Sequence, residues 1–360
     1  METRNNVGMR FGSDNSAGVS APVMEAILAA NHGHQPSYGA DELTLRLEAR
    51  LADLFEHEVS LFLVTTGTAA NALSMAALAP AWGAVLCHEH SHMMVDECGA
   101  PEFHAGAKLV GLSGVGAKVT PDGVTEALAD FAEGFVHQVQ PAALSITQAT
   151  EAGTVYRPDE IAALAEACRP RGLRLHMDGA RFANAIASLG AAPAEITWRA
   201  GVTALSLGAT KNGAMLAEAV VLFDTELARN FGYLRKRAGQ LVSKQRFMAA
   251  QFLAWLENDH WLVLARHANA MATRLADALA LSGAARLAFR PEANEVFAIL
   301  PVAADARLRA AGAAYYPWAA SMLAPDARPG DCEVLVRLVT SFATTPEEVD
   351  RFAALAAAPV

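Results

Sequence analysis

Cysteine is scarce in this chain. The 360 residues include four cysteines, and no two of them form a CxxC pair: Cys87, Cys98, Cys168 and Cys332. This number and spacing exclude a disulfide framework and predict reduced thiols, as in a cytoplasmic protein. Charged residues are also few, at 18%, against 53% hydrophobic residues. That balance excludes intrinsic disorder and predicts a globular protein of two or three domains with a large core.

Positive charge is in deficit. The chain has 28 Lys and Arg against 38 Asp and Glu, for a net charge of −10. This excludes a nucleic-acid partner held by bulk charge, but leaves room for a local phosphate pocket. The polar stretch 1–13 lacks the apolar core of a signal peptide. The uncharged run 59–87 is long enough to span a bilayer, but Thr65–Thr68, Asn71 and Pro80 interrupt it. We therefore expect a soluble, cytoplasmic protein with no membrane partner.

Strand-like runs alternate with helical patterns, such as Pro158–Cys168, up to about residue 223. The predicted strands are 59–64, 84–87, 108–112, 143–147, 173–177, 203–207 and 219–223. This alternation predicts an α/β fold with a mostly parallel seven-stranded sheet covered on both faces. Long helices are expected over 227–281, and mixed strands and helices after residue 284. We expect a segment 1–20, a large domain 21–255 and a small C-terminal α/β domain 256–360.

Ligands of open α/β sheets bind beyond the carboxyl ends of the strands, so the residues there are the candidates. Thr65–Asn71 follows the first strand, and the backbone N–H groups of Gly67, Thr68 and Ala69 at the next helix could cradle a phosphate. An ordinary helix N-cap is the alternative. Asp178, directly after an apolar strand, needs a protonated ring nitrogen or a metal as partner, unless it merely caps a helix.

Further candidates follow other strands. Lys211 lies among small residues, where a lysine can bond covalently to a carbonyl compound, although a lone lysine can equally be a surface cation. His88, His90 and His92 alternate and could bind zinc, or one imidazole could stack on a ligand or move a proton. Arg181 could clamp an anion. A phosphate cup, a histidine, an aspartate and a lysine in this order together indicate pyridoxal phosphate.

Several segments carry a family resemblance over nearly the whole chain. They are Phe11–Asn15, Tyr38–Asp41, Thr66–Asn71, His92, Asp96–Ala100, His176–Arg181, Thr210-Lys211 and Val336–Thr340. With them, the chain resembles the low-specificity L-threonine aldolases, of the aspartate-aminotransferase-like group of pyridoxal phosphate enzymes. Asn31–His34 and Asp96–Phe103 make it most similar to the bacterial branch that includes phenylserine aldolases.

The resemblance implies a role for each matching residue. The residues that would hold the cofactor are Lys211 by a covalent bond, Asp178 at the pyridine nitrogen, His92 stacked on the ring, and Gly67 and Thr68 at the phosphate. Those that would bind the substrate carboxylate, or fix the cofactor near it, are Ser13, Arg181 and Arg337. Tyr38 would belong to the pocket across a subunit interface, and Arg237 or Lys244 of a neighbouring subunit would help to hold the phosphate. The segment 1–20 would contribute to the site.

Two departures from the family pattern affect the site. Many relatives carry a histidine where this chain has Glu151, so the base that takes the substrate hydroxyl proton is Glu151, His92 or a water between them. The glycine-rich stretch of many relatives is replaced by Ala238–Gln245, which weakens the assignment of Lys244.

The implied activity is reversible cleavage of L-threonine, L-allo-threonine or phenylserine-type amino acids to glycine and an aldehyde, in a homodimer or homotetramer with shared sites. The alternatives are β-elimination or deamination on the same fold, a non-catalytic binding protein, or a zinc enzyme.

Overall fold

The larger sheet is mixed but mostly parallel, as the sequence predicts. The structure is a computed structural model and describes residues 8–358. Seven strands lie in the order β1-β7-β6-β5-β4-β2-β3, and β7 runs in the direction opposite to that of the other six. Their bounds are β1 Ser60–Val64, β2 Gly83–His88, β3 Lys108–Leu112, β4 Gln140–Thr147, β5 Arg174–Gly179, β6 Val202–Gly208 and β7 Glu218–Leu222.

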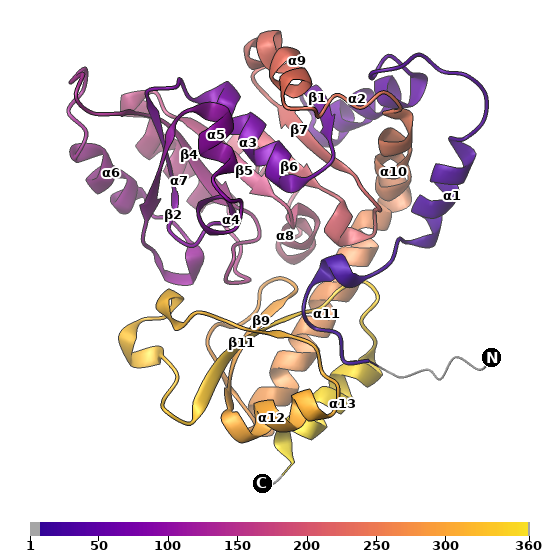
Figure 1. Ribbon diagram of the computed structural model, residues 1–360, viewed down its shortest axis with the longest axis vertical. Coiled ribbons are helices and arrows are strands. Elements are labelled where there is room, and N and C mark those ends of the chain that lie inside the picture. The colour runs from indigo at the N-terminus through magenta and orange to yellow at the C-terminus, as the bar shows by residue number, and fades with distance from the viewer. Residues whose placement is uncertain (1–7, 359–360) are drawn as a thin grey trace.

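Helices cover both faces of this sheet (Figure 1). They are α1 Ala21–Ala29, α2 Glu42–Phe55, α3 Gly67–Leu78, α4 His92–Val95, α5 Ala100–Ala105, α6 Pro121–Ala129, α7 Pro158–Cys168, α8 Phe182–Leu189, α9 Ala228–Arg237 and α10 Arg246–Leu256. Helix α7 begins and ends at the predicted residues. In α2, Leu47, Leu51 and Phe55 recur at helical spacing and are fully buried, and the Asp41 carboxylate caps the helix by accepting from the Thr44 N–H.

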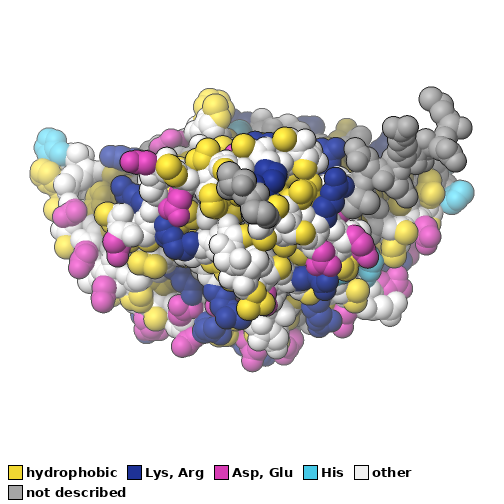
Figure 2. Space-filling model, turned by 90° about the horizontal axis from the view of Figure 1, so that it is seen from below, with side chains coloured by type: hydrophobic (Ala, Val, Ile, Leu, Met, Phe, Trp, Pro, Cys, Tyr) yellow, Lys and Arg dark blue, Asp and Glu magenta, His cyan; other side chains and the backbone are white. Residues whose placement is uncertain are grey.

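The smaller sheet is antiparallel, in the order β10-β11-β9-β8. Its strands are β8 Arg286–Leu287, β9 Glu295–Pro301, β10 Tyr316–Pro317 and β11 Glu333–Val339, and its helices are α11 His260–Leu281, α12 Val302–Ala310 and α13 Pro346–Ala357. The two sheets with their helices form the aminotransferase-like α/β fold. Figure 2, which looks at this end of the molecule, shows acidic and basic side chains interspersed over the face.

Two segments join the two bodies. The first half of α11 packs into the core of the larger sheet through Trp261 and Leu264, and its second half packs into the core of the smaller one through Leu275 and Leu279. The N-terminal stretch also enters the small core, with Phe11 fully buried there. The predicted domain boundaries at residues 20 and 255 therefore stay a prediction. Residues 1–7 and 359–360, at the outer ends of the predicted segments, lie outside the described part.

No helix between residues 8 and 358 combines the length and apolar character that a membrane span requires. The uncharged run 59–87 forms β1, α3 and all of β2 except its last residue, separated by turns.

Candidate active site

A cavity of about 620 Å³ opens at the carboxyl ends of the strands of the larger sheet. The N-terminal segment and the smaller sheet supply its other walls. Nine of the predicted site residues line it: Ser13, Gly67, Thr68, His92, Glu151, Asp178, Arg181, Lys211 and Arg337. The fold thus brings into one cavity residues that are up to 324 positions apart in the chain (337 − 13).

The start of helix α3 forms an open cradle at one end of this cavity. The Thr66 hydroxyl accepts from the Ala69 N–H at 3.0 Å and fixes the turn. The first N–H groups of a helix have no partner within it, and a Cβ built on Gly67 would meet no other atom within 3.9 Å except the Glu218 carboxyl at that distance. The cradle therefore has the space and the donors for a phosphate group.

Asp178 is a buried carboxylate that lacks a cation. Its Oδ2 accepts from Asn71 Nδ2 at 2.8 Å, and its Oδ1 accepts from the Ala180 N–H at 3.0 Å. In the described part of the chain, no basic side chain forms an ion pair with it. Because a buried charge without a partner is costly, the site fits a ligand that brings a protonated ring nitrogen.

Asn71 links Asp178 to the predicted stacking histidine. The same amide nitrogen of Asn71 lies 2.9 Å from Glu97 Oε1, and that oxygen lies 2.8 Å from His92 Nδ1. Glu97 is fully buried, whereas 44% of the His92 side chain is exposed and lines the cavity. The hydrogen bond that the His92 ring donates to Glu97 raises the pKa of His92. The pair keeps a proton on Nδ1 and fixes the orientation of the ring.

Lys211 lies in the turn Thr210–Asn212 that follows β6. Its neighbour anchors the turn, because Asn212 Nδ2 donates to the Trp261 carbonyl and the Asn212 carbonyl accepts from Trp255 Nε1. Among residues 8–358, no carboxylate forms an ion pair with Lys211. Its amine is therefore free to meet a ligand in the cavity.

Glu151 is buried on the wall of the cavity beside His92. Its Oε1 accepts from the His92 N–H and from the Thr147 hydroxyl, each at 2.8 Å, and its Oε2 has no protein partner. Burial raises the pKa of Glu151 to about 7. A carboxyl group with this pKa can accept or donate a proton near neutral pH.

Two arginines face the cavity and differ in how fully their donors are paired with protein carboxylates. Arg181 Nε and Nη2 donate to the two oxygens of Asp14 at 2.8 and 3.1 Å, and Arg181 Nη1 lies 3.4 Å from Glu295. Arg337 reaches Glu295 at only 3.9 Å, lies over the Trp318 ring, and has a buried Nε without a partner. Arg337 is therefore the guanidinium with donors to spare for a ligand carboxylate, and Arg181 is held by two buried carboxylates.

Tyr38, Arg237 and Lys244 do not line this cavity. All three are exposed, and the Tyr38 N–H donates to the Ser243 carbonyl, so Tyr38 and Lys244 lie near each other. Their assignment to the site of a neighbouring subunit stays a prediction.

The alternative of a zinc site receives no geometric support. Within residues 8–358, no group of three or more His, Cys, Asp or Glu side chains is placed to hold a metal ion. His88 is engaged at both ring nitrogens, with the Gly114 carbonyl and with the His90 N–H.

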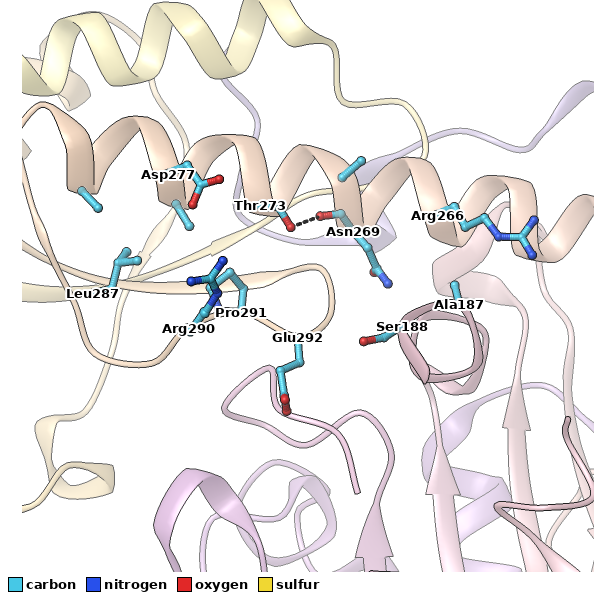
Figure 3. A pocket seen from close by; sticks show the side chains of 13 residues that line it. Ala187, Ser188, Arg266, Asn269, Thr273, Asp277, Leu287, Arg290, Pro291 and Glu292 are labelled. Atoms are coloured by element: carbon cyan, nitrogen blue, oxygen red, sulfur yellow. Dashed lines mark hydrogen bonds between the residues drawn. The ribbon is translucent and has the colours of Figure 1, made fainter. Parts of the chain in front are cut away.

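A second cavity, of about 600 Å³, lies between α8, α11 and the segment that leads into β9. Figure 3 shows Arg266 and Asp277 on α11, with Arg290 and Glu292 on the facing segment. None of the predicted site residues lines it. The candidate chemistry is therefore in the first cavity.

Sequence reasoning missed several residues of the first cavity and its surroundings. They are Asp14, Asn71, Glu97, Glu218, Glu295 and Trp318. Asp14, Asn71 and Glu97 fall within segments that carry the family resemblance, but only the fold shows that Asp14 contacts Arg181 and that Asn71 contacts Glu97.

The fold and the cavity define the class of the protein. It is an α/β protein with the aminotransferase-like fold, which many pyridoxal-phosphate-dependent enzymes share. The structure of a threonine aldolase from Leishmania major is similar, with a TM-score of 0.89 at 27% identity over 96% of this chain and 98% of that one. A serine palmitoyltransferase from Sphingomonas wittichii, at 15% identity and a TM-score of 0.69, covers 97% of this chain and 86% of that one and shares the fold.

Sequence comparison assigns the family. The model of the family "Beta-eliminating lyase" matches residues 10–303. The low-specificity L-threonine aldolase of Pseudomonas aeruginosa is 44% identical over 308 residues, which are 85% of this chain and 88% of that protein. That of Pseudomonas sp. (strain NCIMB 10558) is 42% identical, over 87% of this chain and 90% of that protein. The chain belongs to the beta-eliminating lyase family and, within it, to the low-specificity L-threonine aldolases, as the motifs predict.

Proposed function

We propose that this protein is a pyridoxal-phosphate-dependent aldolase. It cleaves L-threonine, L-allo-threonine or phenylserine-type β-hydroxy-α-amino acids to glycine and an aldehyde, reversibly. The observation that carries the proposal is the convergence of Lys211, Asp178, His92 and the start of α3 on one cavity. Membership of the low-specificity L-threonine aldolases supports the same substrate class.

The residues present fit the cofactor. Lys211 would hold it covalently, Asp178 would face its ring nitrogen, His92 would stack on its ring, and Gly67 and Thr68 would hold its phosphate. When bound, pyridoxal phosphate withdraws electrons from the substrate Cα and so weakens the bond to Cβ. Asp178 supports this by keeping a negative charge beside the ring nitrogen, in an environment where Asn71 and the Ala180 N–H hold the carboxylate in place.

Arg337 and Ser13 orient the substrate. Arg337 offers a planar fork to the substrate carboxylate, which fixes the angle as well as the position of the amino acid. The Ser13 oxygen accepts from the Asn15 N–H, so its own proton is free to donate to the carboxylate. Arg181 supports the site indirectly, because Asp14 and Glu295 already occupy its hydrogen-bond donors.

Glu151 takes the hydroxyl proton of the substrate. Its unpartnered Oε2 and its pKa of about 7 suit a base that works at neutral pH. His92 is the competing base: its Nδ1 is engaged by Glu97, whereas no residue between 8 and 358 forms a hydrogen bond with its Nε2. The pH dependence of a Glu151 variant separates the two.

The working form is a homo-oligomer, dimer or tetramer, with shared sites. The arginines and lysines that line the cavity in the described part of the chain are Arg181, Lys211 and Arg337, and the proposal gives each of them a task other than holding the phosphate. Tyr38 and either Arg237 or Lys244 would reach the site of a neighbouring subunit. Leu28 on α1 and Leu45 on α2 are 64% and 58% exposed, and both helices pack against α10, which supports an interface there. Because all four cysteines are free, the cytoplasm is the compartment we propose.

The second candidate function is β-elimination on the same scaffold, and the description of the matching family model favours considering it. Product analysis separates the two. The purified protein, supplied with pyridoxal phosphate and L-threonine, is expected to release glycine and acetaldehyde in equal amounts. Ammonia with a keto acid would establish elimination instead. The Lys211→Ala variant is the control and should form neither set of products.

A further inference from the structure

Glu218 is a buried carboxyl group beside the phosphate cradle, and the proposed reaction gives it no task. Only 7% of the residue is exposed, yet it lines the cavity. It begins β7, where its backbone pairs with Val64 at the end of β1 and with Gly208 at the end of β6. These pairings place the side chain between two strand ends, at the level where α3 begins.

Two glycines give the Glu218 carboxyl its place. A Cβ on Gly208 would come within 2.9 Å of Glu218 Oε2, and a Cβ on Gly67 would lie 3.9 Å from the same oxygen. Any larger residue at Gly208 would displace the carboxyl. Because Gly67 is also the first residue of α3, the carboxyl lies next to the N–H groups that would hold a phosphate.

Few charges surround Glu218. Helix α3 and strands β1 and β6 contain no charged residue. Lys211 is the cation that acts on it and Asp178 the anion, while the Thr210 hydroxyl is its hydrogen-bond neighbour. On α9, Arg235 Nη1 donates to the Leu63 carbonyl. Burial is the largest influence and raises the pKa of Glu218 to about 7.

Ionised carboxylate and phosphate groups would repel each other strongly in such a place. The effective dielectric constant is low there, and Lys211, the cation of the same chain that acts on Glu218, is the residue proposed to bond the cofactor. The Arg237 or Lys244 proposed to come from a neighbouring subunit would pair with the phosphate itself and not with Glu218. A neutral carboxylic acid, in contrast, is a hydrogen-bond donor to a phosphate oxygen. Resting on the proposed function, we infer that Glu218 binds the cofactor phosphate as a neutral acid, so that phosphate binding takes up one proton from solvent.

Linkage gives the direction of the pH effect. When a group must be protonated in the bound state, the affinity does not change with pH below the pKa that this group has in the free protein. Above that pKa, the affinity falls as the pH rises. The affinity for pyridoxal phosphate should therefore fall by about tenfold per pH unit above pH 7. This fall is measured relative to a variant whose side chain at position 218 cannot ionise, so that pH effects common to both proteins cancel.

The test compares the full-length wild type with the Glu218→Gln variant, in which the amide keeps a donor but cannot ionise. The dissociation constants of pyridoxal phosphate and of pyridoxal, which lacks the phosphate, are measured between pH 6 and 8.5. Glu126→Gln, on the exposed face of α6, is the matched control. We expect the extra pH dependence in the wild type and in Glu126→Gln, with pyridoxal phosphate only.

Each outcome has a distinct meaning. The same pH dependence in Glu218→Gln and wild type, or its persistence with pyridoxal, would overturn the inference and leave the proposed function intact. A wild type that binds no pyridoxal phosphate at any pH would refute the proposed function as well. If Glu218→Gln does not fold, calorimetry of sulfate binding to the wild type at pH 8 in two buffers decides. Sulfate carries no proton at that pH, so uptake of about one proton supports the role of Glu218, and no uptake overturns it.

Discussion

Substituting Asp14 by Asn tests whether the N-terminal segment is part of the structural frame of the cavity. In the wild type, Asp14 and Arg181 form a two-pronged ion pair whose side chains are 1% and 12% exposed. Asn294 donates a third hydrogen bond, to Asp14 Oδ2. An asparagine of the same shape would turn an NH₂ group toward one of these donors and remove the charge.

The size of the effect follows from the burial of the pair. Breaking a buried ion pair costs about 3–5 kcal/mol, because the remaining charge stays buried without a partner. Arg181 keeps Glu295 at 3.4 Å, so the lower end, about 3 kcal/mol, is expected. Arg181 lowers the pKa of Asp14 despite its burial. This stabilisation is therefore present above the unfolded pKa of 3.8 and is lost as the pH falls through the lower folded value.

Urea unfolding, followed by fluorescence at pH 7, measures the loss. The matched control is Asp350→Asn, which breaks an ion pair of the same two-pronged geometry, with Arg274 at 2.8 and 2.7 Å, on the surface. Water screens that pair, so its loss should hardly move the unfolding midpoint. Equal shifts for the two variants would refute the reasoning, since they would show that burial of the Asp14 pair adds nothing.

The other predictions concern the site and the core. Arg337→Lys should raise KM about tenfold or more with a smaller change in kcat, because a lysine cannot form the fork to the carboxylate; an unchanged KM in steady-state assays would remove Arg337 from that role. The wild-type kcat should rise as the pH passes about 7 and Glu151 ionises; Glu151→Gln should lose this rise and about 10²–10⁴-fold in rate, whereas a wild-type pH profile would point to His92. Burial between Ser145 and Ser206 lowers the pKa of His176 to about 4. As the pH falls below 6.5, His176 therefore takes up a proton in the unfolded protein before it does so in the folded protein. About 3 kcal/mol of stability should be lost between pH 6.5 and 4, and a His176→Gln variant with the same loss in urea titrations would contradict this.

The sequence predicted the parts of the fold that have a periodic pattern. Buried parallel strands appear as short apolar runs, and all seven predicted strands form the larger sheet. The rule that ligands bind at the carboxyl ends of such strands then led to Asp178 and Lys211, which lie on the cavity. The antiparallel direction of β7 was not predicted, because a buried strand has the same apolar pattern in either direction.

The residues that the sequence did not reveal act through contacts between distant segments. Asp14 meets Arg181 across 167 positions, and Asn71 meets Asp178 across 107. No local pattern marks such pairs. Glu218 is different, because it has a local signal: its carboxylate stands among the apolar residues Ala217, Ala219 and Val220. Burying a carboxylate there costs free energy, as it does for Asp178 at the end of its own apolar strand. The argument that identified Asp178 would also have identified Glu218.

Covalent labelling at Lys211 tests the central claim most directly. The chain contains five lysines: Lys108, Lys118, Lys211, Lys236 and Lys244. Borohydride reduction of the purified protein with bound pyridoxal phosphate, followed by digestion and mass spectrometry, fixes the cofactor on the amine that holds it. The account predicts one phosphopyridoxyl group per chain, on Lys211. A label on one of the other four lysines, or no label, would contradict it.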